Sequence, residues 1–455
     1  MPTVPPGRIQ ALNDRPIAKG HYILYWMQQS QRVAMNHALA FAIEAANERQ
    51  LPLLVVFGLT ADYPEANRRH YAFMLEGLRE TQKTLADRRV RMVIHHGSPP
   101  EAALSAAKDA ALVVCDRGYM PHQRNWRRQV AEKSPCRVLQ VESDLVVPVS
   151  EASAKAEYAA RTIRPRIHRH LERCLVAFRM PSVKVPSLNL PDDGIALGDI
   201  VATLDELGLD EGVAPVSRFF HGGETAARAR LRRFIERQLP TYHKDRNPPE
   251  KDVGSHLSPY LHFGQISPIA LALKVRAADA PPDATAAFIE ELIVRRELAF
   301  NYATYTTGFD TYVAMPAWAQ KTLAEHEKDP RSPEYSQGRL EAADTHDPYW
   351  NAAMDEMRIT GYMHNYMRMY WGKKVLEWMS TPQLAFRTLL TLNNRYFLDG
   401  RDPNSYAGVG WIFGLHDRAW TERAVYGKVR CMMASGLERK FDIDKYVARV
   451  ESLKG

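Results

Sequence analysis

Short apolar runs rich in β-branched residues alternate with segments of helical periodicity over about the first 145 residues, and this alternation constrains the fold most. The helix-like segments lie around residues 33–48, 65–86 and 121–132. The strand-like runs are His21–Met27, Leu51–Leu59, Arg91–Gly97, Ala110–Gly118 and Arg137–Ser143. Strands alternating with helices predict a parallel sheet. Neither G-x-G-x-x-G nor G-x-x-x-x-G-K-[ST] follows these runs, so the Rossmann-like shape does not identify its ligand.

Two further regions follow the predicted sheet. Residues 149–222 lack a regular pattern and are rich in proline and arginine, which predicts a linker. From residue 223 the pattern is helical, with helices expected over Thr225–Gln238, 285–305, 350–380 and 418–436. We therefore predict an α/β domain over residues 1–148, an interdomain linker over 149–222 and an almost entirely α-helical domain over 223–455.

Composition narrows the class of protein. With 455 residues, the chain is long enough for two folded domains. Charged residues make up 25% of it, and its net charge of +7 favours approach to a polyanion. No apolar run is long enough to cross a bilayer. The histidine pairs 95–96 and 168/170 lack carboxylate or cysteine partners that would complete a metal site, so we expect no metal. The cysteines form no C-x-x-C pair, which favours a reduced cytosol: Cys115, Cys136, Cys174 and Cys431.

Several motifs in the second half of the chain carry the most information. They are G-S-H-L-S-P-Y-L-H-F-G (254–264), E-E-L-I-V-R-R-E (290–297), G-Y-M-H-N-Y-M-R-M-Y-W-G-K-K (361–374), N-N-R-Y-F-L-D-G-R-D-P-N-S-Y (393–406) and G-W-I-F-G-L-H-D-R-A-W (410–420). Together, and in this order, they resemble the flavin-binding core of photolyases, and the particular residues in them resemble those of class II photolyases. The resemblance implies an antenna-type α/β domain and a helical domain that binds FAD and repairs DNA.

The motif over residues 254–264 is suited to bind phosphate. Its residues form a small-residue turn entering a helix at about Pro259, where backbone N–H groups can meet a pyrophosphate. The resemblance implies that FAD phosphates bind here, with Tyr242 nearby; the alternative is an ordinary capped helix start. The residues concerned are Gly254, Ser255, His256, Leu257 and Ser258.

Arg368 shares a helix face with His364 and Asn365, and a buried arginine requires an anion, for which Asp399 is the natural partner. In the photolyases that this chain resembles, such a pair lies against the isoalloxazine ring. Asn365 and Asp402 are also expected at the cofactor. The alternative is a surface ion pair with a turn-forming Asp-Pro-Asn sequence.

An asparagine amide meets flavin N5 in the resembled enzymes. Asn393 and Asn404 are both candidates, and the sequence does not choose between them.

Glu291 occupies the position at which photolyases bind the flipped pyrimidine dimer, although with Arg295 it also forms an ordinary helix pair. Met369 corresponds to a methionine that contacts the dimer and favours a cyclobutane lesion. A departure is Val294, where the common microbial class has tryptophan. We therefore assign base stacking to Trp411 or Trp420.

Trp371 and Trp378 lie seven residues apart, almost on one helical stripe, with Trp350 upstream. Aromatic residues at such spacing usually form core. The resemblance implies instead a relay of electrons to photoexcited oxidised flavin.

Basic residues are expected to bind DNA phosphates, although an arginine-rich helix over 226–238 is equally consistent with a solvated face. Arg246 and Asn247 precede two prolines and resemble the element that fills the gap left by an extruded lesion. The remaining candidates are Lys373, Arg423 and Arg430.

The resemblance implies light-driven repair of cyclobutane pyrimidine dimers by electron transfer from photoexcited reduced FAD (FADH⁻) to the flipped lesion. It implies UV-damaged double-stranded DNA as partner, a monomer, a cytoplasmic protein associated with the nucleoid, and an antenna that is a deazaflavin rather than a folate. The rivals are a cryptochrome-type blue-light signalling flavoprotein and a light-independent flavoprotein oxidoreductase.

Overall fold

A computed structural model describes residues 3–191 and 193–454. The chain divides into two compact units, each described by itself. The sheet unit comprises residues 1–152, 167–231 and 257–277, and the helical unit comprises 153–166, 232–256 and 278–455. The units interleave along the chain, so they do not test the predicted functional boundaries at residues 148 and 222.

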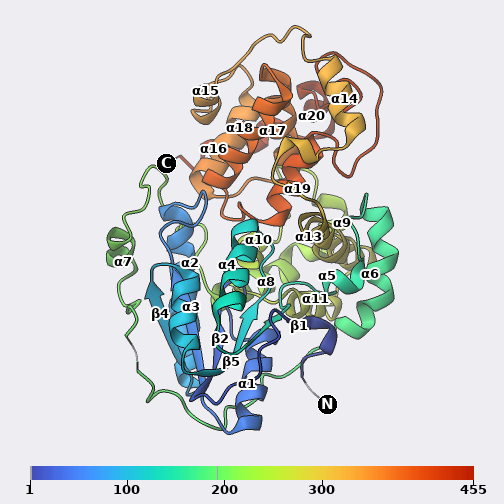
Figure 1. Cartoon of the computed structure of the whole chain (residues 1–455). Helices are drawn as coiled ribbons and strands as arrows, with labels where there is room; N and C mark the ends of the chain where they lie inside the picture. The colour runs from blue at the N-terminus through green and yellow to red at the C-terminus, as the bar shows by residue number, and fades with distance from the viewer. Residues whose placement is uncertain (1–2, 192, 455) are drawn as a thin grey trace. The chain divides into compact units, whose positions relative to one another are not determined.

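The sheet unit is built on a six-stranded sheet with the order β1-β6-β5-β2-β3-β4 (Figure 1). All neighbouring strands are parallel except β1 (Ile9–Ala11), which pairs antiparallel with β6. The others match the predicted strands: β2 (Tyr22–Trp26), β3 (Leu53–Leu59), β4 (Arg91–His96), β5 (Ala110–Asp116) and β6 (Arg137–Val141). β3 and β5 are buried at every position, as expected of strands covered on both faces.

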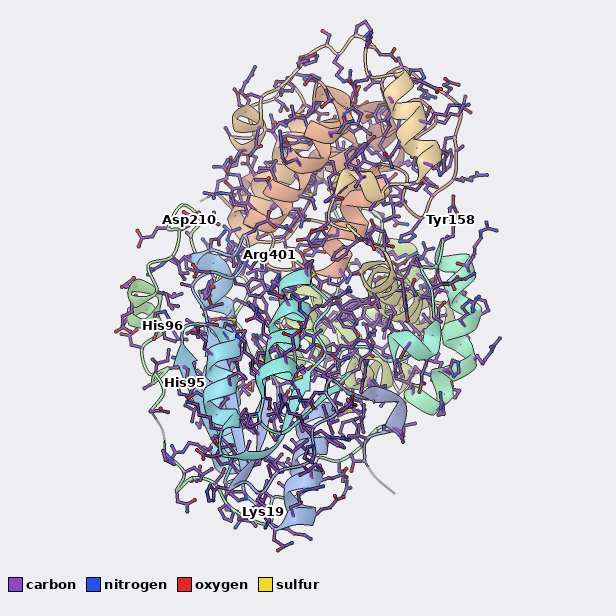
Figure 2. The ribbon with its side chains drawn as sticks, viewed as in Figure 1. Lys19, His95, His96, Tyr158, Asp210 and Arg401 are labelled. Atoms are coloured by element: carbon purple, nitrogen blue, oxygen red, sulfur yellow. The ribbon has the colours of Figure 1, made fainter. Side chains whose placement is uncertain are left out.

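Alternate side chains of β2 enter two different apolar cores. Ile23 and Tyr25 belong to one core, and Leu24 and Trp26 belong to the other. The predicted helices are confirmed as α1 (His37–Arg49), α2 (Arg68–Asp87) and α4 (Pro121–Lys133), whereas α3 (Pro99–Ala107) and β1 were not predicted. His95 and His96 lie at the end of edge strand β4, where His96 is exposed (Figure 2).

The predicted irregular linker is partly wrong. It contains α5 (Val149–Ala152), α6 (Ala160–Cys174) and α7 (Ile200–Glu206). Pro165 lies inside α6, although its composition suggested a break. Proline content therefore overstated the irregularity of this region.

The described part of the helical unit contains no strand. The unit includes α9 (Tyr242–Asp245), α12 (Pro282–Ile289), α13 (Arg296–Tyr305), α14 (Ala317–Glu325), α15 (Gln337–Glu341), α16 (Pro348–Thr360), α17 (Asn365–Trp378), α18 (Pro382–Tyr396), α19 (Pro403–Ile412), α20 (Ala434–Lys440) and α21 (Ile443–Glu451). α8 (Glu224–Arg237) is shared between the two units, while α10 (Ser258–His262) and α11 (Pro268–Arg276) belong to the sheet unit.

Two helix predictions need correction. The helix expected over 350–380 is two helices, because Gly361 ends α16 in the left-handed conformation with φ 75°. The helix expected over 418–436 is wrong, since regular helix begins only at Ala434. An isolated bridge pairs Arg423 with Gly427, whose φ of 53° is incompatible with a continuing α-helix.

Along residues 3–191 and 193–454, no helix is both long and apolar enough to span a membrane.

Candidate functional site

The predicted pair of Arg368 and Asp399 is confirmed. Nη1 and Nη2 of Arg368 each donate to one carboxylate oxygen of Asp399 at 3.0 Å, a bidentate geometry that fixes both groups in one plane. The guanidinium also lies 3.9 Å from the centre of the Phe397 ring and 5.4 Å from that of Tyr362. The arginine side chain is 25% exposed, so the pair can meet a ligand.

The loop that carries Asp399 is held by hydrogen bonds to its own backbone. Arg401, at φ 60°, donates its N–H to Oδ1 of Asn394 at 2.9 Å and its Nη1 to the Asn394 carbonyl at 2.6 Å. Ser405 donates to the Asp399 carbonyl at 3.0 Å. These hydrogen bonds fix the conformation of the turn that carries Asp399.

The two asparagine candidates for flavin N5 differ in environment. Asn393 is buried and donates to Oδ1 of Asn394 at 2.9 Å. Asn404 is exposed and donates to Asp402 at 2.7 Å, while Asp402 also caps the N-terminus of α19. Both asparagines flank the Asp399 loop and remain candidates.

The motif predicted to bind phosphate begins beside Tyr362. A Cβ at Gly254 would lie 3.1 Å from the Tyr362 hydroxyl, so the backbone approach favours glycine there. His256 stacks on Tyr362 at 4.4 Å and its Nε2 lies 3.0 Å from Asp252, with φ 52°. Leu257 and Ser258 belong to the sheet unit, where α10 begins at Ser258 without a side-chain cap.

His364 is the N-cap of α17, one turn before Arg368, and its carbonyl accepts from the Arg368 N–H at 3.0 Å. Its ring accepts from the Tyr366 N–H at 3.2 Å. Burial lowers the pKa of His364 to about 4, so the ring is neutral and can act as this acceptor. Asn365 begins the helix and is exposed.

A buried carboxylate that the sequence did not reveal secures this region. Glu356 accepts from the His364 N–H at 3.1 Å, from the Tyr446 hydroxyl at 2.8 Å and from Arg449 at 2.8 Å. Arg449 also lies 3.9 Å from Asp252. α21 is thereby linked to both segments around Tyr362, a relation that no single motif indicated.

Three predicted residues meet at a second part of the helical unit. Arg246 donates to Glu291 at 2.8 Å, and its guanidinium lies 5.7 Å from the centre of the Tyr242 ring. Glu291 lies in a π-helical turn, Glu290–Arg295, and its side chain is 39% exposed. Such turns often occur at functional sites because they redirect side chains.

The predicted helix pair of Glu291 with Arg295 does not form, since Arg295 pairs with Glu290 at 3.3 Å. Asn247 is exposed and Met369 is partly exposed.

The three predicted relay tryptophans form one buried cluster. The ring centres of Trp350 and Trp371 are 6.5 Å apart at an interplanar angle of 15°, and those of Trp350 and Trp378 are 5.5 Å apart. Trp371 lies 6.4 Å from Phe397, which contacts Arg368. A continuous aromatic path therefore runs from the Arg368 pair into the core.

The assignment of Lys373 to DNA is wrong. Its side chain is completely buried, and Nζ donates to the Ile412 carbonyl at 2.6 Å and lies 4.8 Å from the Trp411 ring centre. Burial lowers the pKa of Lys373 to about 7. The ammonium therefore cannot reach a phosphate on the protein surface.

The other basic candidates lie in the segment after α19. Arg430 binds Asp417 at 3.0 Å and lies 4.0 Å from the centre of the Trp420 ring. Trp420 is 36% exposed and Arg423 is exposed, so both are accessible, whereas Trp411 is partly covered by Lys373 and Arg430.

Comparisons with known proteins identify the family. Residues 23–186 match the sequence model described as DNA photolyase. The deoxyribodipyrimidine photo-lyase of Methanothermobacter thermautotrophicus is 49% identical over 450 residues, covering 98% of each chain. The chain belongs to the DNA photolyase family. The predicted family, and the expectation of an enzyme of that family, are thereby confirmed.

Solved structures confirm the predicted fold class of a parallel α/β sheet with an extensive helical region. A Synechocystis cryptochrome has a TM-score of 0.73 at 16% identity, covering 94% of this chain and 88% of its own. An archaeal photolyase of Sulfolobus tokodaii with two FAD molecules has a TM-score of 0.71 at 17% identity, covering 95% of this chain and 90% of its own.

Proposed function

We propose that this protein is a class II photolyase that uses light to split cyclobutane pyrimidine dimers in UV-damaged double-stranded DNA. The observation that carries the proposal is the partly exposed Arg368–Asp399 pair, backed by Phe397 and by the buried tryptophan path. The family membership supports the same chemistry.

The residues present fit FAD. A planar ion pair with aromatic neighbours suits a flavin ring. Gly254 and its neighbours are the residues that would meet a phosphate group. When bound, reduced FAD would supply the light-excited electron that breaks the two carbon–carbon bonds joining the pyrimidines, and the electron returns without net redox change. Arg368, Asp399 and Asp402 would orient the ring system, with Asn393 or Asn404 at N5.

Glu291 is suited to hold the lesion. A carboxyl in a π-helical turn can accept from the N3–H of a flipped pyrimidine, and when protonated it can donate to a carbonyl. Arg246 already orients this group at 2.8 Å. Met369 would contact the dimer, and Trp420 or Trp411 would stack on a base.

DNA is expected to bind along exposed basic groups. Arg423 and Arg430 would contact phosphates, while Arg246 and Asn247 would fill the space left by the flipped dimer. Trp371, Trp350 and Trp378 would conduct electrons that restore reduced flavin. We further propose that the protein acts as a monomer on cytoplasmic, nucleoid-associated DNA.

We propose a deazaflavin antenna, and unsatisfied polar atoms in the sheet unit support the binding of a chromophore there. Both side-chain polar atoms of Gln28 are buried without a hydrogen-bond partner among the described residues. Nε2 of His122 is buried without such a partner as well. The His122 ring packs 4.5 Å from Tyr63 and 5.0 Å from Trp126. A planar chromophore with polar edges would satisfy these groups and stack on these rings.

The test is repair of a defined thymine dimer in a duplex oligonucleotide, with the flavin chemically reduced, under blue or near-ultraviolet light and in darkness. Restoration of two intact thymines only in light is expected. Absence of repair by protein with bound, reduced FAD would overturn the proposal and favour cryptochrome-type signalling. Consumption of a nicotinamide cofactor in darkness would favour an oxidoreductase.

A further inference from the structure

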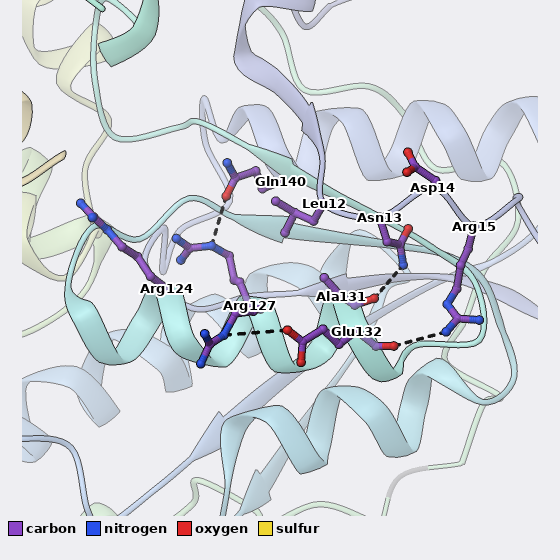
Figure 3. Close-up of a pocket in the computed structure, with 10 residues that line it drawn as sticks. Leu12, Asn13, Asp14, Arg15, Arg124, Arg127, Ala131, Glu132 and Gln140 are labelled. Carbon is purple, nitrogen blue, oxygen red and sulfur yellow. Dashed lines mark hydrogen bonds and ion pairs between the residues drawn. The ribbon is translucent and has the colours of Figure 1, made fainter. Parts of the chain in front are cut away.

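An arginine-lined pocket opens beside α4 in the sheet unit (Figure 3). Its volume is about 690 Å³, within the range of small-molecule sites. One wall is α4, and the other is the segment after β1 together with β6. The lining residues are Leu12, Asn13, Asp14, Arg15, Arg124, Arg127, Arg128, Ala131, Glu132 and Gln140.

Arg127 is the most informative of these residues. It is 6% exposed, and it donates to Oε1 of Gln140 at 3.1 Å (Figure 3). It also donates to the Gly118 carbonyl at 2.6 Å. Both acceptors are neutral, and Nη1 has no hydrogen-bond partner in the part of the chain that the structure describes. A buried guanidinium without a carboxylate partner is costly, because desolvation is offset only by weak dipoles.

The rest of the lining does not neutralise this charge. Glu132 lies 4.0 Å from Arg128, and both side chains are largely exposed. Arg15 donates to the Glu132 carbonyl at 3.2 Å, and Asp14 is exposed. The pocket holds four arginines and two carboxylates, so it retains an excess of positive charge.

We propose that this pocket binds a small molecule carrying a phosphate or diphosphate group. Such an anion would accept from Arg124 and supply the missing counter-charge for Arg127, and guanidinium groups match phosphate oxygens in geometry. The volume also accommodates a nucleoside attached to the phosphate. The proposal does not depend on the photochemistry proposed above, because every lining residue lies within residues 12–140 of the sheet unit.

The test is calorimetric titration of the FAD-loaded protein with pyrophosphate and, separately, with ADP. We expect saturable binding of both, or of ADP alone if the nucleoside is required. Arg124→Gln should weaken binding by about 10-fold or more, as expected for one charge-assisted hydrogen bond. Lys133→Gln is the control, because Lys133 is an exposed cation on the same helix outside the pocket.

Arg127→Gln provides a second variant, whose folding is checked by its thermal melt and bound flavin. Equal affinity in the wild type, Arg124→Gln and Arg127→Gln would place the anion elsewhere and overturn the proposal, as would no saturable binding of either probe. Competition by a thymidine oligonucleotide that is lost in Arg124→Gln would assign the pocket to a DNA backbone, which would also overturn it.

Discussion

Trp350 and Trp371 are joined both through their rings and through a hydrogen bond: the rings lie nearly parallel at 6.5 Å, and the Trp350 indole N–H donates to the Trp371 carbonyl at 3.0 Å. The bond fixes the middle ring of the proposed relay.

Trp350→Phe should therefore slow photoreduction of oxidised flavin, because phenylalanine is much harder to oxidise and lacks the N–H donor. We expect a fall of about 10-fold or more, corresponding to at least ~1.4 kcal/mol in the barrier. Repair by chemically reduced protein should be unchanged. Trp318→Phe serves as control, because Trp318 lies on α14 with its ring beside Gly414 and is not one of the three clustered tryptophans. An unchanged photoreduction rate in Trp350→Phe would remove Trp350 from the relay.

Glu291→Ala should sharply lower the repair yield while flavin stays bound, because the proposed partner of this carboxyl is the lesion, and in the structure it pairs with Arg246 and not with Arg368. Loss of one buried hydrogen bond to substrate corresponds to about 10-fold or more. Repair yield per absorbed photon and flavin absorbance are the two measurements. Glu290→Gln is a matched control, since Glu290 pairs with Arg164 and Arg295 in the same turn. Equal yields in both variants would exclude the assigned role.

Arg449→Gln should weaken FAD retention although Arg449 belongs to no flavin motif. The variant leaves Glu356 buried without its cationic partner and separates Asp252 from α21. We expect the FAD dissociation constant to rise about 10-fold, measured by fluorescence of released flavin. Lys445→Gln is the control on α21, because Lys445 is exposed and forms its ion pair with Asp442 on the same helix end. Identical retention would show that α21 does not support the flavin site.

Lys373 should make stability depend on pH. Its folded pKa of about 7 lies below the value of 10.5 for an exposed lysine, so the unfolded chain binds more protons between these values. The free energy of unfolding should therefore rise with pH from about 7 toward 10, by at most ~1.4 kcal/mol per pH unit from this group. Denaturant unfolding of wild type and Lys373→Met, compared at pH 7 and 9, measures the effect. The same pH dependence in both proteins would contradict it.

The local sequence pattern predicted the structure correctly where the residues of a segment determine its conformation by themselves. The apolar runs that became β3 and β5 are buried along their whole length, so their composition indicated strands on its own. Arg368 and Asp399 were paired correctly because a guanidinium largely withdrawn from water needs an anion, and the resemblance to photolyases indicated Asp399.

Tertiary contacts decided what the sequence could not show. β1 has only three residues and is a strand because β6 pairs with it. Lys373 looked like a surface cation, yet Ile412 and Trp411 surround its ammonium. The apparent helix over 418–436 is displaced by contacts of Asp417 with Arg430 and Trp420. Each of these depends on residues that are distant in sequence or on side chains that compete with helical hydrogen bonding.

β1 also has a consequence for the behaviour of the sheet in concentrated solution. Its three residues pair with Leu139, Gln140 and Val141, and so occupy backbone groups of β6 that would otherwise form an open edge. Open edges invite pairing between molecules, and a short antiparallel strand is an economical way to block them. At the opposite edge, β4 ends in the polar residues His95 and His96. A three-residue edge strand therefore offers fewer free backbone groups for pairing between molecules than the longer β6 would.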